Sequence, residues 1–470
     1  MGVPARADSV RTELQKVAVS CAVALPPGIR SDKAIPEAMR RIVFLLSVVL
    51  IGALPNAAAD GMLDPSFGNG GLVTTAFPFP FSSDYASAVI VLPDGRAVAA
   101  GGVGDLDGHA MGAARYLTSG ALDTTFSSDG RATVAGCSSI GAGGGASAAL
   151  LQPDGRLVLV GECPGGLSLS VARLNENGAL DLSFGSNGQV KTSFPGGVFA
   201  AAAMLQPDGR IVAVGNAVGC CTTTAIQAAR YNPDGSLDPS FGTGGKLTLQ
   251  LAQDFVVADA VLQGDGKLVI AGIFDGGTLD DFGIVRLLPN GALDPSFDGD
   301  GVVISDFGSD EAIGSVIVLG DGRIVLGGRR LNDFALVRYL PDGSLDGTFG
   351  NGGLATADSG ASETIGQLIA LPNGKLLAAG STFTAQDGPI DFLLARFHAD
   401  GVLDTSFGSS GFLKTDFNSG SKDGCGAVAV AGPDLVLAAG RTFGAADFGD
   451  FALARYIAST PVELLTFEVE

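Results

Sequence analysis

Short apolar runs recur along the chain, and glycine-rich turns separate them. In the fifth copy of a repeated unit, the segments 301–305, 317–319, 323–327 and 334–339 are rich in β-branched and other apolar residues. The Gly-Asp-Gly sequence between the second and third segments has the Asp-Gly pair that marks a β-hairpin between two apolar runs. The pattern predicts four short antiparallel strands in each unit.

Several of these runs are apolar at every position and do not alternate with polar residues. Residues 89–92 and 157–160 are examples. A strand of this kind is covered on both of its faces. Sheets of four antiparallel strands that cover one another are the blades of a propeller. An open solenoid is disfavoured by the hairpin turns, and a mixed α/β repeat by the lack of a 3.6-residue apolar period. The predicted fold class is all-β, a seven-bladed β-propeller.

The number of blades comes from a motif, Leu-Asp-x-Ser/Thr-Phe-x-x-x-Gly, which occurs seven times with a period of about 52–59 residues. Its copies begin at Leu63, Leu122, Leu180, Leu237, Leu293, Leu345 and Leu403. We expect the motif phenylalanines to fill the space between adjacent blades. The last glycine of each copy, such as Gly71, is expected at positive φ or at a close backbone contact.

An arginine ends the last apolar run of each unit, and six of these arginines precede a motif aspartate by eight residues. A charge inside an apolar strand has to be paired, because an isolated buried charge is too costly. We therefore predict one ion pair for each repeat. Asp64 has no such arginine upstream and Arg455 has no motif aspartate downstream, so these two should meet if the ring closes, with Glu463 as the competing partner of Arg455. The predicted pairs are Arg115–Asp123, Arg173–Asp181, Arg230–Asp238, Arg286–Asp294, Arg338–Asp346, Arg396–Asp404 and Arg455–Asp64.

The motif, together with Pro-Asp-Gly-Arg/Lys and with Asp-Phe-x-Leu-Ala-Arg-Tyr at 450–456, resembles the bacterial delta-60 repeat family. The resemblance covers about residues 60–456. It implies a secreted or surface-associated, propeller-like protein, with no established activity and no catalytic residues to assign.

The N-terminal region predicts export. Met39, Arg40 and Arg41 precede an apolar run at 42–54 and a small-residue exit at 57–59, as in a secretory signal peptide. We interpret 1–38 as an upstream extension that is not translated, 39–59 as the signal peptide, 60–456 as the propeller and 457–470 as a short tail. An internal apolar helix or a signal-anchor is the alternative. The expected location is the periplasm, the cell surface or the extracellular space, with no transmembrane span in the mature chain.

The composition and net charge of the chain limit the classes of partner that can be expected. The formal net charge is −21, and the segment before Asp60 holds more basic than acidic residues, so the mature chain would be more acidic still. Such a chain repels nucleic acid, so no nucleic-acid partner is expected, and it stays soluble. With 71 glycines among 470 residues, it suits strands and turns better than long helices. We expect a monomer.

Candidate chemistry is sparse, and the sequence favours no catalytic residue and no cofactor. If a metal binds, Ca²⁺ at Asp298 and Asp300 is the candidate, although their loop lacks the spaced ligands of an EF-hand. In an exported chain, Cys137 and Cys163 are the first candidates for a disulfide, and Cys220 and Cys221 could compete for the pairing. The alternative is that no cysteine is paired.

Function is expected in the connections that differ between repeats, because loops carry binding residues. The most distinctive connection contains Phe77, Phe79, Phe81 and Tyr85. These aromatics suit stacking on a sugar or a partner surface, or else form a flap that packs over the first repeat. The sequence favours a non-catalytic scaffold that binds an extracellular protein or polysaccharide. The alternatives are a propeller-channel lyase or hydrolase, and a structural module of a larger surface assembly.

Overall fold

The computed structural model describes residues 60–79, 83–105, 108–134, 144–163, 168–217, 225–276, 279–383, 388–443 and 449–458. These residues form strands and turns, and no helix occurs among them. The part of the chain described here therefore contains no helix with the length and hydrophobicity that a membrane span needs. The predicted segments 1–38 and 39–59, and the tail from 459 onward, lie outside the described residues.

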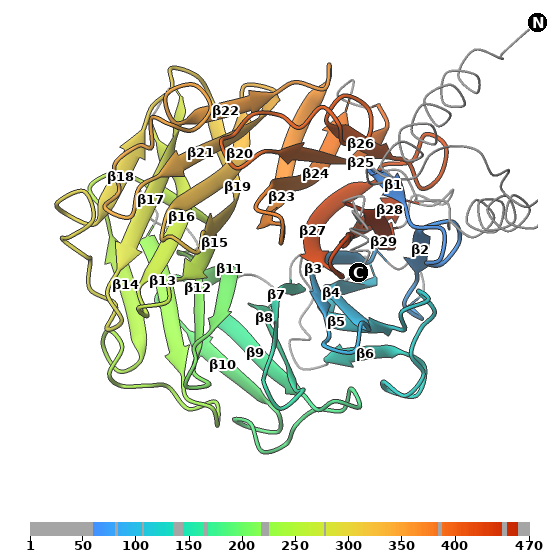
Figure 1. Cartoon of the computed structure of the whole chain (residues 1–470). Coiled ribbons are helices and arrows are strands. Elements are labelled where there is room, and N and C mark those ends of the chain that lie inside the picture. The colour runs from blue at the N-terminus through green and yellow to red at the C-terminus, as the bar shows by residue number, and fades with distance from the viewer. Residues whose placement is uncertain are drawn as a thin grey trace, which may run out of the picture. The chain divides into compact units, whose positions relative to one another are not determined.

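Seven antiparallel sheets follow one another around a ring, as Figure 1 shows. Six sheets have four strands and the last has five, so the prediction of a seven-bladed β-propeller is confirmed. The innermost strands are β3 (Tyr85–Val91), β7 (Ala146–Leu151), β11 (Val198–Leu205), β15 (Phe255–Leu262), β19 (Glu311–Val318), β23 (Ser362–Ala370) and β27 (Gly424–Val430). The second strands are β4 (Ala97–Asp105), β8 (Leu157–Glu162), β12 (Ile211–Ala217), β16 (Leu268–Asp275), β20 (Ile324–Arg330), β24 (Leu376–Phe383) and β28 (Leu435–Phe443).

The third strands carry the repeated arginines. They are β5 (Gly108–Tyr116), β9 (Ser168–Leu174), β13 (Ala225–Tyr231), β17 (Asp280–Leu287), β21 (Asp333–Tyr339), β25 (Ile390–Phe397) and β29 (Gly449–Ile457). The outer strands are β6 (Arg131–Val134), β10 (Gln189–Ser193), β14 (Lys246–Gln250), β18 (Val302–Ser305), β22 (Leu354–Ala357), β26 (Phe412–Thr415) and β2 (Leu72–Thr75), and β1 (Met62–Leu63) adds a short fifth strand to the last sheet.

Each blade begins one strand later than the predicted four-strand unit. The run that follows each motif was expected to open a blade, but it forms the outer strand of the blade that precedes it. For example, β18 pairs with β17, and the chain then crosses to β19, the inner strand of the next blade. The motif thus lies inside a blade, in the turn between its third and outer strands, where apolar patterning alone gives no boundary.

Because the blades are shifted by one strand relative to the repeats, the last blade contains strands from both ends of the propeller, and this closes the ring. The last blade takes β27, β28 and β29 from the C-terminal end and its outer strand, β2, from the N-terminal end of the propeller, so the blue and red strands of Figure 1 share one sheet. Leu72 pairs with Ala454, and Leu63 of β1 pairs with Tyr456. On the inner side, each innermost strand contacts the next, and β27 contacts β3. One sheet therefore joins the two ends of the propeller.

The blades pack through apolar side chains on both faces of their middle strands. Residues 157–160 of β8 are all buried, as expected for a run that is apolar at every position, whereas residues 89–92 are half-buried. Every residue of β9 and β13 is also buried, including the arginine in each strand. The seven motif phenylalanines are at most 1% exposed and lie in the clusters between blades. Gly71, which ends the first motif, has φ 103°, and a Cβ there would lie 2.7 Å from Cβ of Leu63, so only glycine fits.

Each predicted arginine lies in a buried cluster that we call the latch, made of the arginine, the motif aspartate, the motif serine or threonine, and the motif phenylalanine. In the third blade, Nε of Arg230 lies 2.7 Å from Oδ2 of Asp238. The guanidinium also donates to Oγ of Ser240 at 2.8 Å and stacks 4.9 Å from the ring centre of Phe241. Its remaining donor bonds the backbone oxygen of Pro289 in the next blade. The latch therefore satisfies a buried charge and ties adjacent blades together.

All seven predicted ion pairs are present, with Nε–Oδ2 distances of 2.7 or 2.8 Å. They are Arg115–Asp123, Arg173–Asp181, Arg230–Asp238, Arg286–Asp294, Arg338–Asp346, Arg396–Asp404 and the ring-closing Arg455–Asp64. Burial raises the pKa of Asp346, but hydrogen bonds from Thr348 and Arg338 outweigh it and lower that pKa to about 2. The other six aspartates also have lowered pKa values, so the pairs stay charged at neutral pH.

Candidate functional site

The two ends of the propeller differ in how much they repeat. The hairpins between first and second strands, and the motif turns with their latches, lie at one end, which we call the hairpin face. The connections between second and third strands, and from each outer strand to the next blade, lie at the other end, which we call the variable-loop face. Because the repeated residues at the hairpin face bind one another, the variable-loop face and the channel hold the candidate binding residues.

The aromatic residues of the predicted loop differ in their surroundings, because some pack in the core and Tyr85 lines a pocket. Phe77 is 3% exposed and its ring centre lies 5.1 Å from that of Phe451, so it belongs to the core and not to a binding surface. Phe79 is half-buried against the same apolar cluster. Phe81 lies outside the described residues. The flap interpretation therefore holds for Phe77, and Tyr85 is the member of the set that reaches a pocket.

Tyr85 lines a pocket of about 250 Å³ at the variable-loop face, between the last and first blades. Arg441 and Cys425 also line it. Burial raises the pKa of Tyr85, the charge of Glu162 raises it further, and Arg441 opposes both. The pocket thus combines an aromatic ring, a guanidinium and a nearby carboxylate. Cys425 is buried and has no disulfide, and burial raises its pKa to about 12, so its thiol is protonated at neutral pH.

The pocket adjoins the central channel, with which it shares Ser87 and Gly426. The channel has a volume of about 460 Å³ and all seven innermost strands line it. Each of these strands has a β-bulge at the channel, and the bulged residue is alanine, glycine or serine. At Gly314, a Cβ would lie 1.9 Å from the backbone oxygen of Ile365, so the close approach of inner strands keeps the lining small.

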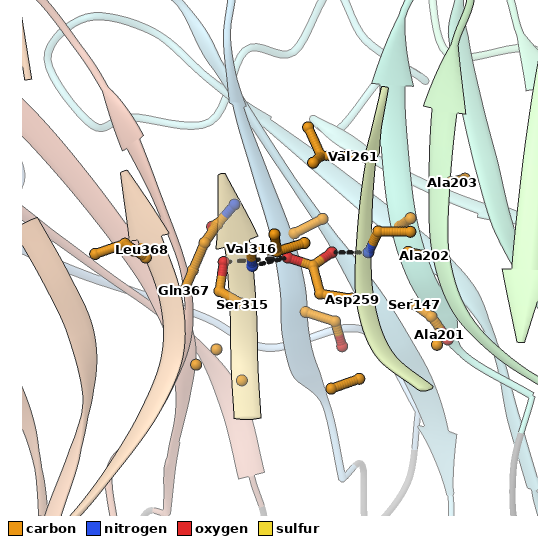
Figure 2. A pocket seen from close by; sticks show the side chains of 18 of the residues that line it. Ser147, Ala201, Ala202, Ala203, Asp259, Val261, Ser315, Val316, Gln367 and Leu368 are labelled. Atoms are coloured by element: carbon orange, nitrogen blue, oxygen red, sulfur yellow. Dashed lines mark hydrogen bonds between the residues drawn. The ribbon is translucent and has the colours of Figure 1, made fainter. Parts of the chain in front are cut away.

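Asp259 is the acidic side chain in the channel lining, and sequence analysis did not single it out. It extends from β15 toward β19, as Figure 2 shows, where its carboxylate accepts hydrogen bonds from the backbone N–H of Val316 at 2.9 Å and the hydroxyl of Ser315 at 3.1 Å. The backbone N–H of Ala260 donates to its other oxygen at 2.8 Å. Burial raises the pKa of Asp259 to about 6, although these hydrogen bonds oppose the shift.

Asp259 should make the free energy of unfolding depend on pH between about 4 and 6. Its folded pKa lies above its unfolded value, so its ionisation costs stability, and that cost develops as pH rises from about 4 to 6 and persists above. We expect Asp259→Asn to gain stability relative to the native chain over this interval, by about 3 kcal/mol at pH 7. Urea unfolding of both proteins at pH 4, 5, 6 and 7 measures the difference. Parallel pH profiles would contradict the assignment.

Three groups of carboxylates lie at equivalent places on the variable-loop face. Each group takes one residue from the start of a third strand, one from just after an outer strand, and one from the start of the next blade's inner segment. In each group, one oxygen per residue lies within 4.8 Å of the others. The groups are Asp281, Asp306 and Glu311; Asp333, Asp358 and Glu363; and Asp391, Asp416 and Asp423.

The carboxylates in these groups repel one another. Burial raises the pKa of Glu363, and the charges of Asp333 and Asp358 raise it further. The same two causes raise the pKa of Asp281, where the neighbouring charges include Asp306. These groups were not predicted, because their members come from different predicted units.

The predicted Ca²⁺ candidates, Asp298 and Asp300, lie in the turn before β18. Asp298 is exposed in a turn with φ 51°, and Asp300 accepts a hydrogen bond from the backbone N–H of Val302 at 2.9 Å. Neither belongs to the three carboxylate groups found among the described residues. Cys163 is in a disulfide, and its predicted partner, Cys137, lies outside the described residues.

Five segments match the family model described as "Domain of unknown function (DUF5122) beta-propeller", at residues 152–184, 206–241, 263–297, 319–349 and 371–407. The chain carries repeats of a β-propeller family. Each match runs from a hairpin turn to a motif phenylalanine, and so contains all four residues of a latch. The delta-60 name is not tested by these matches. No curated protein matches the chain.

Several solved structures are similar to this chain at low sequence identity. A virginiamycin B lyase from Staphylococcus aureus has 9% identity and a TM-score of 0.47, with 82% of this chain and 98% of that chain covered. A protein of unknown function from Dyadobacter fermentans has 12% identity and a TM-score of 0.44, covering 84% and 100%. The polysaccharide lyase Uly1 has 12% identity and a TM-score of 0.45, covering 87% and 96%. Similarity at this level gives no argument about activity here.

Proposed function

We propose that this propeller is an exported, non-catalytic scaffold that binds an extracellular polysaccharide at the Tyr85 pocket on its variable-loop face. The observation that carries the proposal is the difference between the two ends. The repeated charged residues of the hairpin face pair with one another, in latches or within hairpin turns. By contrast, Tyr85 and Arg441 come from unrepeated positions and line one pocket beside the channel, with Glu162 nearby.

The chemistry of this pocket suits a sugar. An aromatic ring offers a face for stacking against the C–H groups of a pyranose, and a guanidinium offers several hydrogen-bond donors to hydroxyl or carboxylate groups. The guanidinium of Arg441 lies 5.0 Å from the ring centre of Phe443, which holds it at the pocket. The disulfide of Cys163 is consistent with export, since disulfides persist in oxidising compartments.

A glycan array and a cell-envelope pull-down test the proposal. We expect the native chain to bind a defined class of glycan, and Tyr85→Ala and Arg441→Ala to bind it at least about tenfold more weakly, a loss of about 1.4 kcal/mol. Arg323→Ala is the matched control, because Arg323 is a half-exposed arginine paired with Asp321 on the hairpin face.

The control should bind like the native chain, and all four proteins should have similar circular dichroism. A glycan that binds equally well to both pocket variants would place the site elsewhere. Capture of an envelope protein, with no glycan bound, would replace the polysaccharide proposal by a protein-binding one. If the native chain binds nothing, the structural-module alternative gains support.

A further inference from the structure

Two of the carboxylate groups each bring a buried, a half-buried and an exposed acid together without a cationic partner among the described residues. In the first, Asp281 and Asp306 come from the fourth blade and Glu311 begins the inner strand of the fifth. The second group repeats this arrangement one blade further on, with Asp333, Asp358 and Glu363. We call them the first and second acidic junctions, because each lies where one blade meets the next.

Each junction has a buried glutamate with one unused oxygen. Glu311 and Glu363 are both 1% exposed. Oε1 of Glu311 accepts a hydrogen bond from the hydroxyl of Ser309 at 2.8 Å, and Oε1 of Glu363 accepts one from the backbone N–H of Ser359 at 3.2 Å. Their Oε2 atoms have no hydrogen-bond partner among the described residues. A buried carboxylate oxygen without a partner is costly, and here it lies in a group of like charges.

The nearby arginine does not supply the missing charge. Arg330 acts electrostatically on Asp333, but its guanidinium donates to the backbone oxygen of Phe307 at 2.7 Å. Among the described residues it forms no ion pair with a member of either junction.

The third carboxylate group shows what a cation does at this position. There, Nζ of Lys414 lies 2.5 Å from Oδ2 of Asp391. Both oxygens of Asp423 are also satisfied, by the backbone N–H of Phe417 at 2.8 Å and the hydroxyl of Ser421 at 2.8 Å. The residues that share the sheet position of Lys414 are Ile304 in the first junction and Thr356 in the second, neither of which is charged. The fold thus places an ammonium group in one of three equivalent groups.

We infer that the first and second acidic junctions are binding sites for a divalent cation, and that the cation is Ca²⁺. The donors are carboxylate oxygens alone, a set that suits hard cations such as Ca²⁺, Mg²⁺ and Mn²⁺, without the sulfur or imidazole ligands that favour zinc or copper. Three carboxylates that bind through one or both oxygens, with water, supply the six to eight oxygens that Ca²⁺ takes in flexible geometry. Exposed Asp306 and Asp358 leave each site open to solvent, which fits the affinity range of extracellular modules, about 10⁻⁴–10⁻³ M.

A bound ion would tie neighbouring blades together on the variable-loop face, as the latches do on the hairpin face. It would join Asp281 on β17 and Asp306 after β18 to Glu311 on β19, across the crossover between blades. The inference goes beyond the proposed binding function and does not depend on it, because neither junction includes a residue of the Tyr85 pocket.

Equilibrium dialysis of the full chain against CaCl₂, with scanning calorimetry, tests the inference. We expect saturable binding of two Ca²⁺ per chain, and a melting temperature about 2–4 °C higher in about 5 mM CaCl₂ than in EDTA. Glu311→Gln and Glu363→Gln should each lose one ion, and the double variant should lose both. Thr356→Lys should also lose one ion, because it places an ammonium where Lys414 lies in the third group.

The melting temperature in EDTA separates a metal site from a packing role. Removing one charge from an empty junction relieves repulsion, so the glutamine variants should melt in EDTA at or above the native temperature. The inference is overturned if the native chain takes up less than one Ca²⁺ at about 10 mM, if the double variant binds as many ions as the native chain, or if the glutamine variants are destabilised in EDTA without any change in Ca²⁺ uptake.

Discussion

A chain that begins at residue 76, without β1 and β2, is expected to lose its cooperative unfolding transition or to melt at least about 10 °C lower. The deletion removes the outer strand of the last blade, the buried ring of Phe67 and the Asp64 partner of Arg455. Loss of the partner of a buried charge alone costs about 3–5 kcal/mol. It also removes Asp60, whose carboxylate lies 2.5 Å from the guanidinium of Arg396. Circular dichroism during heating measures the effect.

A circular permutant supplies the control for this deletion. In the third blade, Tyr231 is bridged to Leu237 across the turn at 232–236, just as Tyr456 pairs with Leu63 in the last blade. A copy of that turn should therefore join Tyr456 to Leu63 and return residues 63–75 to the C-terminal end. We expect this permutant to unfold cooperatively, within a few degrees of the native chain. If the deletion variant melts like the native chain, the N-terminal strand does not close the ring.

Replacement of Arg230 by methionine is expected to lower the free energy of unfolding by about 3–5 kcal/mol. The change leaves buried Asp238 without its closest cation, removes the donor to Pro289 in the next blade and removes the stack on Phe241. Urea unfolding monitored by circular dichroism measures the loss.

Arg210→Met is the matched control, because Arg210 also contacts Asp238, at 3.1 Å, but its side chain is 38% exposed. An exposed pair contributes at most about 1 kcal/mol. Equal losses in the two variants would show that the latch stabilises no more than a surface ion pair does.

The number of repeats, the antiparallel strands and the ion pairs could be predicted from the sequence, because each depends on a short-range pattern of residues. Apolar runs and Asp-Gly turns are local, and the eight-residue spacing from Arg230 to Asp238 spans a single turn between two strands. Even the ring-closing pair of Arg455 and Asp64 followed, because six complete pairs leave one member of each type unmatched.

The boundaries of the blades did not follow from local pattern. A run such as 302–305 reads as a strand whichever sheet it joins, and only the paired backbone groups show that it completes the preceding blade. The inner strands were also underestimated. The apolar run at 317–319 was predicted as a strand, but β19 begins at Glu311, because small and polar residues are needed where inner strands meet around the channel.

The sequence by itself determined a seven-fold propeller and the latches that hold its blades. Polar side chains that do not belong to a latch come together at other places, and only the tertiary structure decided where these places are. Asp259, the Tyr85 pocket and the acidic junctions each combine residues from different blades, and their proximity depends on how the sheets stack around the ring. Pattern along the chain specifies strands and the turns between them, whereas the contacts between sheets are set by packing.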